Sequence, residues 1–423
     1  MELKHIFDSR KANHKYNTSY PLTPSQWQGY RVDGEPDFSH DQRLSFYMHI
    51  PFCEHLCKFC EYTRMHLPSN EMQSSYIETL KNDALTFLKE YPNRTLLGFD
   101  IGGGTPTALN LNSFAKLMEL YTIVVSQMEI SDDYQPSIEA TFQTISEEKA
   151  MLIQQVGIKR VSLGIQSSIG GVQKSNGRIN ANKQRVSETL DMLHSTGIEK
   201  VNLDFMYGLK NQQLNDIKAD IEFIKAIQPE QITLYELRTN MLLTSYQPDK
   251  PALFDSYCLL YDSLLDMGYY ANFGQNTFSK SKDDKGLSSY LRHRMIEFAP
   301  YKGFGISAQS LSRNEISYNE GKLKGDFTDI LCKKSILATY TYRLPKDEML
   351  SKYIAVSGYY GSFSITTASG LLGNDFCKFF EKELDFCINE GLVSIQGDMI
   401  TITKAGFINY GAVFSLFYMK DSI

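Results

Sequence analysis

The sequence lacks any long hydrophobic run. No stretch approaches about 18 uninterrupted apolar residues, the length of helix that crosses a bilayer, so no membrane span is expected. The N-terminus, MELKHIFDSRKANHKY, lacks the apolar region of a secretory signal, so a cytoplasmic location is expected. Positive charge is not in excess either: 43 Lys and Arg face 49 Asp and Glu, a formal charge of −6. This balance argues against a nucleic-acid binder held by a diffuse basic surface.

Apolar residues are not scarce, which excludes wholesale disorder. Of the 423 residues, 42% are hydrophobic and 12% aromatic. At about 150 residues per domain, the length predicts two to three domains with a large packed core.

Cysteine is sparse and odd in number, so a disulfide framework is not expected. Four of the seven cysteines are scattered through apolar surroundings and are predicted to be buried free thiols: Cys258, Cys332, Cys377 and Cys387. The other three form the cluster Cys53-x3-Cys57-x2-Cys60. Clustered thiols in a reducing compartment are typical of metal binding.

Strand-like and helix-like runs alternate from Ser45 onward, after an irregular arm over residues 1–44. The strand-like runs are SFYMHIPF, TLLGFDIGGG, PSIEATF, RVSLGIQS, KVNLDFMYG and QITLYEL, each followed by a helix-like stretch. This alternation predicts an α/β fold with parallel strands, either an open doubly wound sheet or an incomplete (β/α) barrel. In both folds ligands bind beyond the carboxyl ends of the strands.

The alternation stops near residue 312. The remaining chain predicts a helix near Asp375–Asn389, a hairpin over 392–403 and a last helix from Lys404, an order typical of a winged-helix-like cap. This segment has no basic stripe, so DNA binding is not expected. We therefore expect three regions: an N-terminal arm at 1–44, a core domain at 45–312 and a C-terminal helical domain at 313–423.

The cysteine loop leaves the first predicted strand, and its spacing allows two metal centres. Zinc would need a fourth ligand, which His49, His55 or His66 could provide. A [4Fe–4S] cluster held by three thiolates would instead leave its fourth iron open to a ligand. A second signal favours the cluster: the next strand ends in a glycine run, 102–106, where backbone groups can approach a ligand without Cβ interference. This run is no phosphate-binding P-loop, because Gly-Lys-Ser/Thr does not follow.

Taken together, these motifs resemble the radical S-adenosylmethionine (SAM) enzymes, and more narrowly the oxygen-independent coproporphyrinogen III dehydrogenase-like family. The resemblance rests on Tyr47-x-His49-Ile50-Pro51-Phe52-Cys53-x3-Cys57-x-Phe59-Cys60 and on the Gly102–Thr107 segment. SLGIQS, NGR, LDFMYGL and GFGISAQS follow in the family's order. The match covers about residues 45–312 and implies an incomplete (β/α)6 radical SAM barrel.

The resemblance also implies roles for individual residues. Cys53, Cys57 and Cys60 would bind three irons of a [4Fe–4S] cluster, and one or two SAM molecules would bind beside it. The residues that match SAM contacts are Gly103, Gly104, Thr105, Tyr47 and Glu139 for the first molecule, and Phe59, Gln166, Arg178 and Asp204 for a second. His55 and His66 match nothing in the family and are interpreted as solvated or structural.

The implied activity is a radical reaction in which cleaved SAM yields a 5′-deoxyadenosyl radical that removes hydrogen from a substrate. By resemblance the substrate is a porphyrin or heme-type tetrapyrrole, and an electron donor such as flavodoxin or ferredoxin is the expected partner. Two departures from the coproporphyrinogen enzyme keep other branches open: Tyr62 replaces a further cysteine and Arg238 replaces a small residue. Gln309 stands near the place where the heme-chaperone branch carries a His. The alternatives are a two-SAM methyltransferase, a heme-degrading enzyme and a heme chaperone without oxidase activity.

Overall fold

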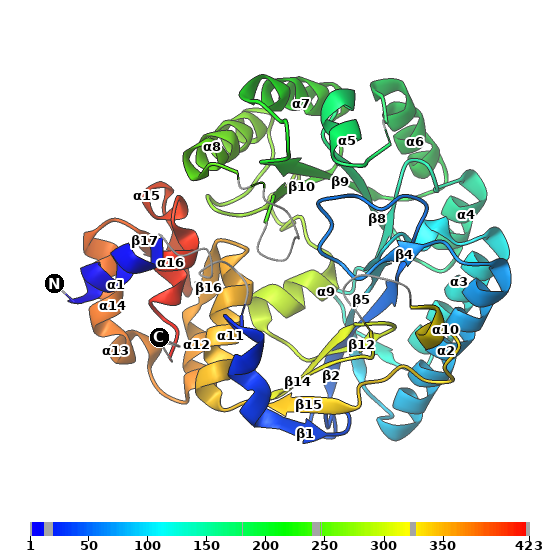
Figure 1. Ribbon diagram of the computed structural model, residues 1–423, viewed down its shortest axis with the longest axis horizontal. Helices are drawn as coiled ribbons and strands as arrows, with labels where there is room; N and C mark the ends of the chain where they lie inside the picture. Colours follow the sequence, from blue (N-terminus) through cyan, green and yellow to red (C-terminus); the bar gives the residue numbers. More distant parts are fainter. Residues whose placement is uncertain are drawn as a thin grey trace.

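Six parallel strands form the curved sheet at the centre of the protein (Figure 1). The computed structural model describes residues 2–11, 20–179, 181–238, 246, 248–321 and 327–419. In spatial order the six strands are β2 (Arg43–Ile50), β5 (Thr95–Gly103), β7 (Ser137–Ala140), β8 (Arg160–Gln166), β9 (Lys200–Tyr207) and β10 (Gln231–Glu236). Their spatial order follows their sequence order, as in a barrel built from consecutive βα units. The predicted incomplete (β/α)6 barrel is confirmed.

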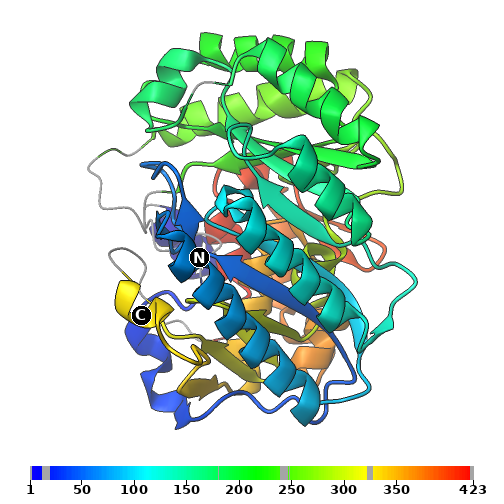
Figure 2. The same ribbon diagram turned by 90° about the vertical axis from the view of Figure 1, so that its right-hand side faces the viewer.

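Helices connect these strands and cover their outer face (Figures 1 and 2). They are α2 (Asn70–Glu90), α3 (Leu111–Val125), α4 (Glu147–Gln155), α5 (Gly170–Ser175), α6 (Lys183–Ser195), α7 (Leu214–Ile227) and α8 (Lys250–Asp266). Side-chain caps define several starts: Ser69, Asn110 and Ser146 each accept a hydrogen bond from a backbone N–H in the first turn.

Alternating side chains on the strands separate the hydrophobic core from the barrel interior. In β8, Val161, Leu163 and Ile165 are buried and belong to the main hydrophobic core. The residues between them, Ser162 and Gly164, pair with the polar positions of the neighbouring strands. Because successive side chains of a strand point to opposite faces, the apolar set packs under the helices and the polar set lines the interior.

The sheet continues on both sides of the six strands. Strand β12 (Tyr301–Phe304) pairs parallel with β2, and antiparallel β11 (Thr277–Ser279) closes the other edge at β10. Beyond β12 the sheet adds β13 (Gln309–Ser312), β14 (Glu315–Tyr318), β15 (Tyr340–Arg343) and β1 (Arg31–Asp33), and short β6 (Glu129–Ile130) pairs with β5. The sheet therefore extends past residue 312, and the domain boundaries stay predictions.

The N-terminal segment is more regular than the sequence indicates. It forms α1 (Glu2–Lys11), a 3-10 helix η1 (Pro24–Tyr30) and β1, so the expectation of an irregular arm is wrong for these residues. Tertiary contacts explain the difference. Phe7 packs edge-on against Phe386 at 5.9 Å, and Trp27 donates a 2.9 Å hydrogen bond to Glu348. Short elements with no steady period of their own are stabilised here by packing.

The C-terminal region packs beside the barrel, together with α1 (Figure 1). Its elements are α11 (Lys346–Gly358), β16 (Ser362–Ser364), α12 (Ile365–Leu372), α13 (Phe376–Phe379), α14 (Glu381–Asn389), β17 (Val393–Gln396), β18 (Met399–Ile402), α15 (Lys404–Phe407) and α16 (Tyr410–Ser415). The three strands form a small sheet in the order β16-β18-β17, which gives the predicted winged-helix-like arrangement. Among the helices of the described residues, none has the length and apolar character needed to cross a membrane.

Candidate active site

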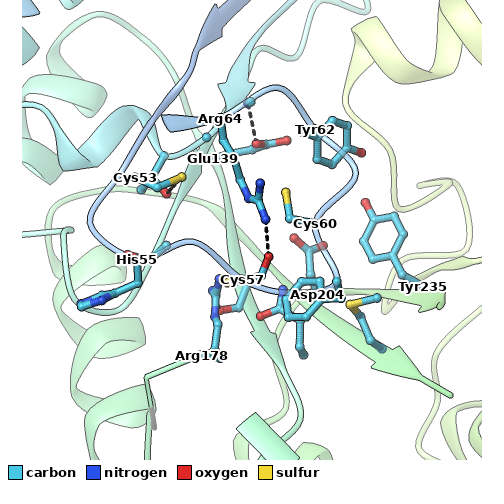
Figure 3. Close-up of a pocket in the computed structure, with 18 of the residues that line it drawn as sticks. Cys53, His55, Cys57, Cys60, Tyr62, Arg64, Glu139, Arg178, Asp204 and Tyr235 are labelled. Atoms are coloured by element: carbon cyan, nitrogen blue, oxygen red, sulfur yellow. Dashed lines mark hydrogen bonds between the residues drawn. The ribbon is translucent and has the colours of Figure 1, made fainter. Parts of the chain in front are cut away.

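A cavity opens at the carboxyl ends of the parallel strands, where an α/β barrel places its ligands. It encloses about 200 Å³. One side is the cysteine loop that follows β2, and the other sides come from the ends of β5, β7, β8, β9 and β10 (Figure 3). Eleven of the twelve predicted site residues line it: Cys53, Cys57, Phe59, Cys60, Gly103, Gly104, Thr105, Glu139, Gln166, Arg178 and Asp204.

Tyr47 is the predicted residue that does not line the cavity. Its hydroxyl lies 3.2 Å from Nδ1 of His49, and its ring stacks on Tyr290 at 5.6 Å. His49 Nε2 lies 2.8 Å from the carbonyl oxygen of Thr63, so the neutral ring donates there and accepts from Tyr47. Burial lowers the pKa of His49 to about 4, which keeps the ring neutral at physiological pH. A contact between Tyr47 and a ligand stays a prediction.

The cysteine loop presents three free thiols to the cavity (Figure 3). Cys53 and Cys57 are buried and Cys60 is half-buried. Burial raises the pKa of the Cys53 thiol to about 11 and also raises that of Cys60. A metal would therefore have to displace protons from these thiols when it binds.

The remaining four cysteines are also free thiols. Cys258 and Cys387 are buried as expected, Cys377 is half-buried, and the prediction of burial is wrong for Cys332, which is exposed.

The glycine run at the end of β5 has no room for side chains. Gly103 has φ +114°, and its N–H donates a 2.9 Å hydrogen bond to Oε2 of Glu139. The N–H of Gly104 donates a 2.8 Å hydrogen bond to the carbonyl oxygen of Ile50. The two backbone segments are then so close that a Cβ atom on Gly104 would lie 2.7 Å from the carbonyl carbon of Pro51. The glycines are therefore needed for close packing of the backbone against neighbouring protein atoms. The sequence had predicted them only for close approach to a ligand.

Two carboxyl groups face this cavity, that of Glu139 on β7 and that of Asp204 on β9, with β8 between the two strands (Figure 3). Burial, together with the nearby carboxylate of Asp204, raises the pKa of Glu139 to about 7, against the hydrogen bond from the N–H of Gly103. Burial likewise raises the pKa of Asp204 to about 6, against hydrogen bonds from Ser162 and Asn202. Both groups can accept hydrogen bonds from a ligand ammonium or hydroxyl group.

Gln166 and Arg178 meet beside the backbone of Gly164. Gln166 adopts φ +63°, and its Oε1 is buried without a hydrogen-bond partner among the described residues. Arg178 donates a hydrogen bond to the carbonyl oxygen of Gly164, and its Nη1 lies 3.6 Å from Sγ of Cys57. Gln166 thus combines an unusual backbone angle with a buried side-chain oxygen that lacks a partner, and this combination is typical of a residue that contacts a ligand.

Comparison with known proteins decides the family. The model of the radical SAM superfamily matches residues 47–224, the stretch that carries the cysteine loop and the glycine run. Residues 47–224 form a radical SAM domain.

Curated relatives support the predicted family. The heme chaperone HemW of Bacillus subtilis is 22% identical over 392 residues, covering 88% of this chain and 98% of the relative. An oxygen-independent coproporphyrinogen III oxidase of Synechocystis is 24% identical over 455 residues, covering 98% of this chain and 96% of the relative. The predicted family is thereby confirmed.

A solved structure confirms the fold. Coproporphyrinogen III oxidase (HemN) from Escherichia coli superposes with a TM-score of 0.75 at 20% identity, covering 96% of this chain and 97% of that one. Both the barrel and the C-terminal region lie within this coverage.

Radical SAM proteins use a [4Fe–4S] cluster and SAM, and the residues of this chain fit both. The free thiols of Cys53, Cys57 and Cys60 line one cavity from a single loop, and three thiolates are the ligands of a [4Fe–4S] cluster with one open iron. In the described part of the chain, no three His, Cys, Asp or Glu side chains converge as closely as ligands of a single metal ion do. The unsatisfied oxygen of Gln166 and the carboxyls of Glu139 and Asp204 suit the polar groups of SAM.

Several residues that line the cavity were not predicted as site residues, among them Glu61, Arg64, Tyr235, Arg238 and Tyr359. Glu61 and Arg64 follow the cluster cysteines closely, so their position in the sequence could have suggested them. Tyr235 and Arg238 lie at or just beyond the end of β10, where barrel ligands bind. Tyr359 gives no such signal, because it lies far along the chain at the end of α11.

Proposed function

We propose that this chain is a radical SAM enzyme that oxidises a carboxylated tetrapyrrole in the manner of a coproporphyrinogen III oxidase. The observation that supports this proposal is the mixed lining of the cavity. Besides the cysteines and the polar groups, large apolar and aromatic side chains line it: Phe59, Tyr62, Ile179, Met206, Tyr235 and Tyr359. A flat macrocycle can stack on these side chains while its carboxylate groups contact the polar ones.

These apolar and aromatic side chains come from different parts of the fold. Phe59 and Tyr235 pack against a small hydrophobic cluster that includes Val172 and Leu237. Tyr235 also stacks on Tyr359, with ring centroids 6.5 Å apart. Rings fixed by packing lose little entropy on binding, so they can position a substrate at low cost.

In this proposal the cofactors supply the radical chemistry, and the side chains of the protein position SAM and the substrate. The bound cluster, reduced by a donor such as flavodoxin or ferredoxin, and SAM supply the radical that removes a hydrogen atom from the substrate. Glu139, Gln166 and Asp204 orient the polar groups of SAM, and the aromatic side chains place the carbon to be attacked and exclude water.

A heme chaperone without oxidase activity is the second candidate, because relatives similar over most of their length carry that name. Gln309 stands near the position at which the chaperone branch carries a His. Its amide donates a 2.6 Å hydrogen bond to Tyr318, and it is not among the residues that line the cavity. This placement offers no heme ligand there and favours the enzyme.

The test is an anaerobic reaction of the reduced holoprotein with SAM and either coproporphyrinogen III or heme, followed by mass spectrometry. Loss of carbon dioxide from coproporphyrinogen III supports the proposal. Gain of a methyl group identifies a two-SAM methyltransferase, and opening of heme identifies a heme-degrading enzyme. Stoichiometric heme binding with no chemical change identifies a chaperone. The variant with Cys53, Cys57 and Cys60 all replaced by Ala is the control for uncatalysed change.

The aromatic side chains can be tested separately. Tyr235→Ala should raise KM for the tetrapyrrole more than it weakens SAM binding, because it removes stacking area and leaves the polar side chains in place. Tyr270→Ala, at an exposed position outside the cavity, is the matched control. An unchanged KM in Tyr235→Ala would place the substrate elsewhere.

A further inference from the structure

Each of the first two cluster cysteines is held by contacts within its loop and by one side chain from outside the loop. Cys53 lies in β3 (Phe52–Cys53), which pairs with β4 (Met65–His66), and Oγ1 of Thr105 lies 3.7 Å from its sulfur. Cys57 is held from two sides: Arg64 donates to its carbonyl oxygen, and Nη1 of Arg178 lies 3.6 Å from its sulfur. Both thiols are thereby fixed relative to the strands.

The third cysteine has a different anchor. Glu61, the residue directly after Cys60, forms an ion pair with Arg238, with Oε2 2.7 Å from Nη2. The two side chains are only 20% and 27% exposed. Such a partly buried pair is specific in geometry, and loss of one member leaves the other charge poorly solvated.

The anchor continues into the C-terminal region through an aromatic ring. The guanidinium carbon of Arg238 lies 5.1 Å from the ring centroid of Tyr359, a cation–π contact. Tyr359 follows the last residue of α11, two positions before Gly361. Gly361 abuts the barrel so closely that a Cβ atom on it would lie 2.6 Å from the carbonyl carbon of Gly274. The ring is therefore held by a tight junction of backbone against backbone.

We propose that Glu61, Arg238 and Tyr359 form a clamp by which the C-terminal region holds the Cys60 end of the cysteine loop and so sets how firmly the cluster is retained. All three are positioning residues, since they act through Cys60. With two thiols fixed to the barrel, the motion of the third determines how often one corner of the cluster opens. The clamp concerns the loop and is independent of which substrate the cavity receives.

The experiment measures the rate at which a strong iron chelator removes iron from the anaerobically reconstituted holoprotein. Glu61→Gln and Arg238→Gln should each accelerate iron loss about fivefold, the effect of roughly 1 kcal/mol for a partly exposed pair. The double variant should lose iron no faster than either single variant, because both substitutions remove the same contact. Arg238→Lys keeps the positive charge and should retain iron nearly as well as the wild type. Tyr359→Phe, which keeps the ring, should lose iron at the wild-type rate, whereas Tyr359→Leu should lose it faster.

The control is the ion pair between Arg292 and Asp133, whose side chains are 31% and 41% exposed and lie outside the cavity. Arg292→Gln should leave iron loss unchanged. Electron paramagnetic resonance of the reduced cluster with SAM should broaden in the clamp variants, while the melting temperature of the apoprotein stays within about 2 °C of the wild type. Wild-type iron retention in both Glu61→Gln and Arg238→Gln, or additive effects in the double variant, would overturn the clamp. If Arg238→Gln does not fold, wild-type iron retention in Tyr359→Leu would overturn the clamp instead.

Discussion

The imidazole of His49 occupies the space in which a side chain at Gly103 would stand. A Cβ atom on Gly103 would lie 2.5 Å from Cε1 and from Nδ1 of the ring. The ring is fixed on both sides, by Tyr47 at Nδ1 and by the carbonyl oxygen of Thr63 at Nε2. Strands β2 and β5 can therefore approach each other at this level only if residue 103 is glycine.

Gly103→Ala should destabilise the apoprotein by about 1–3 kcal/mol, because it adds a clash with His49 to a backbone angle of φ +114° that other residues rarely adopt. Chemical denaturation of the apoprotein measures the change. Gly171→Ala in α5, where a Cβ atom would meet nothing within 4 Å, is the matched control and should be neutral or slightly stabilising. Equal stability of the two variants would contradict the structural role of Gly103.

Anaerobic reconstitution should give roughly four irons and four sulfides per chain, because three thiolates hold three irons of a [4Fe–4S] cluster. Replacement of Cys53, Cys57 and Cys60 by Ala should abolish this content, as measured by iron and sulfide analysis with the visible absorption spectrum. Cys258→Ala, at a buried cysteine of α8, should retain the full content. Stoichiometric zinc in protein purified anaerobically from iron-replete cells would exclude the cluster.

Asp100→Asn should stabilise the apoprotein more at pH 8 than at pH 5. Burial raises the pKa of Asp100 to about 7, and its Oδ1 has no hydrogen-bond partner among the described residues. A carboxyl whose pKa is raised in the folded state stabilises that state only while protonated. Its contribution is complete below the unfolded value of about 4 and is lost as the pH rises through about 7. Asparagine does not ionise and so avoids this loss.

Melting temperatures of Asp100→Asn and the wild type at the two pH values measure this effect. Asp191→Asn, at an exposed position of α6, should show no such difference. An identical shift of the melting temperature at both pH values would show that the carboxyl of Asp100 does not titrate in this range.

Asp204→Ala should remove one equivalent of bound SAM while leaving the iron content unchanged. Asp204, Gln166 and Arg178 offer an anion, an amide and a cation at the ends of β8 and β9 or just beyond, which suits a second SAM molecule. The first SAM would remain anchored by the open iron. Anaerobic equilibrium dialysis, with and without substrate, should therefore count two equivalents in the wild type and one in the variant. A wild-type count of one would remove the two-SAM arrangement and with it the methyltransferase alternative.

The local pattern of the sequence determined much of the barrel and of the cluster loop. Strand-like and helix-like runs alternate at a regular spacing, and local hydrophobic periodicity with capping residues such as Ser69 and Asn110 defines the elements. The three cysteines are neighbours in the chain, so their joint function needs no tertiary information. The resemblance to radical SAM enzymes implied Glu139, Gln166 and Asp204 as site residues, and they meet because parallel strands place their carboxyl ends together.

Only the tertiary structure decided which distant residues complete the site. Tyr359 lies 121 positions beyond Arg238 in the numbering, yet the ring and the guanidinium are in contact. No periodicity predicts such a contact, because it depends on the docking of the C-terminal region at Gly274 and Gly361. The same reason explains the N-terminal segment, whose helix and strand form against partners more than 300 residues away. Contacts of this range are set by packing of the whole chain, and a local reading of the sequence does not contain them.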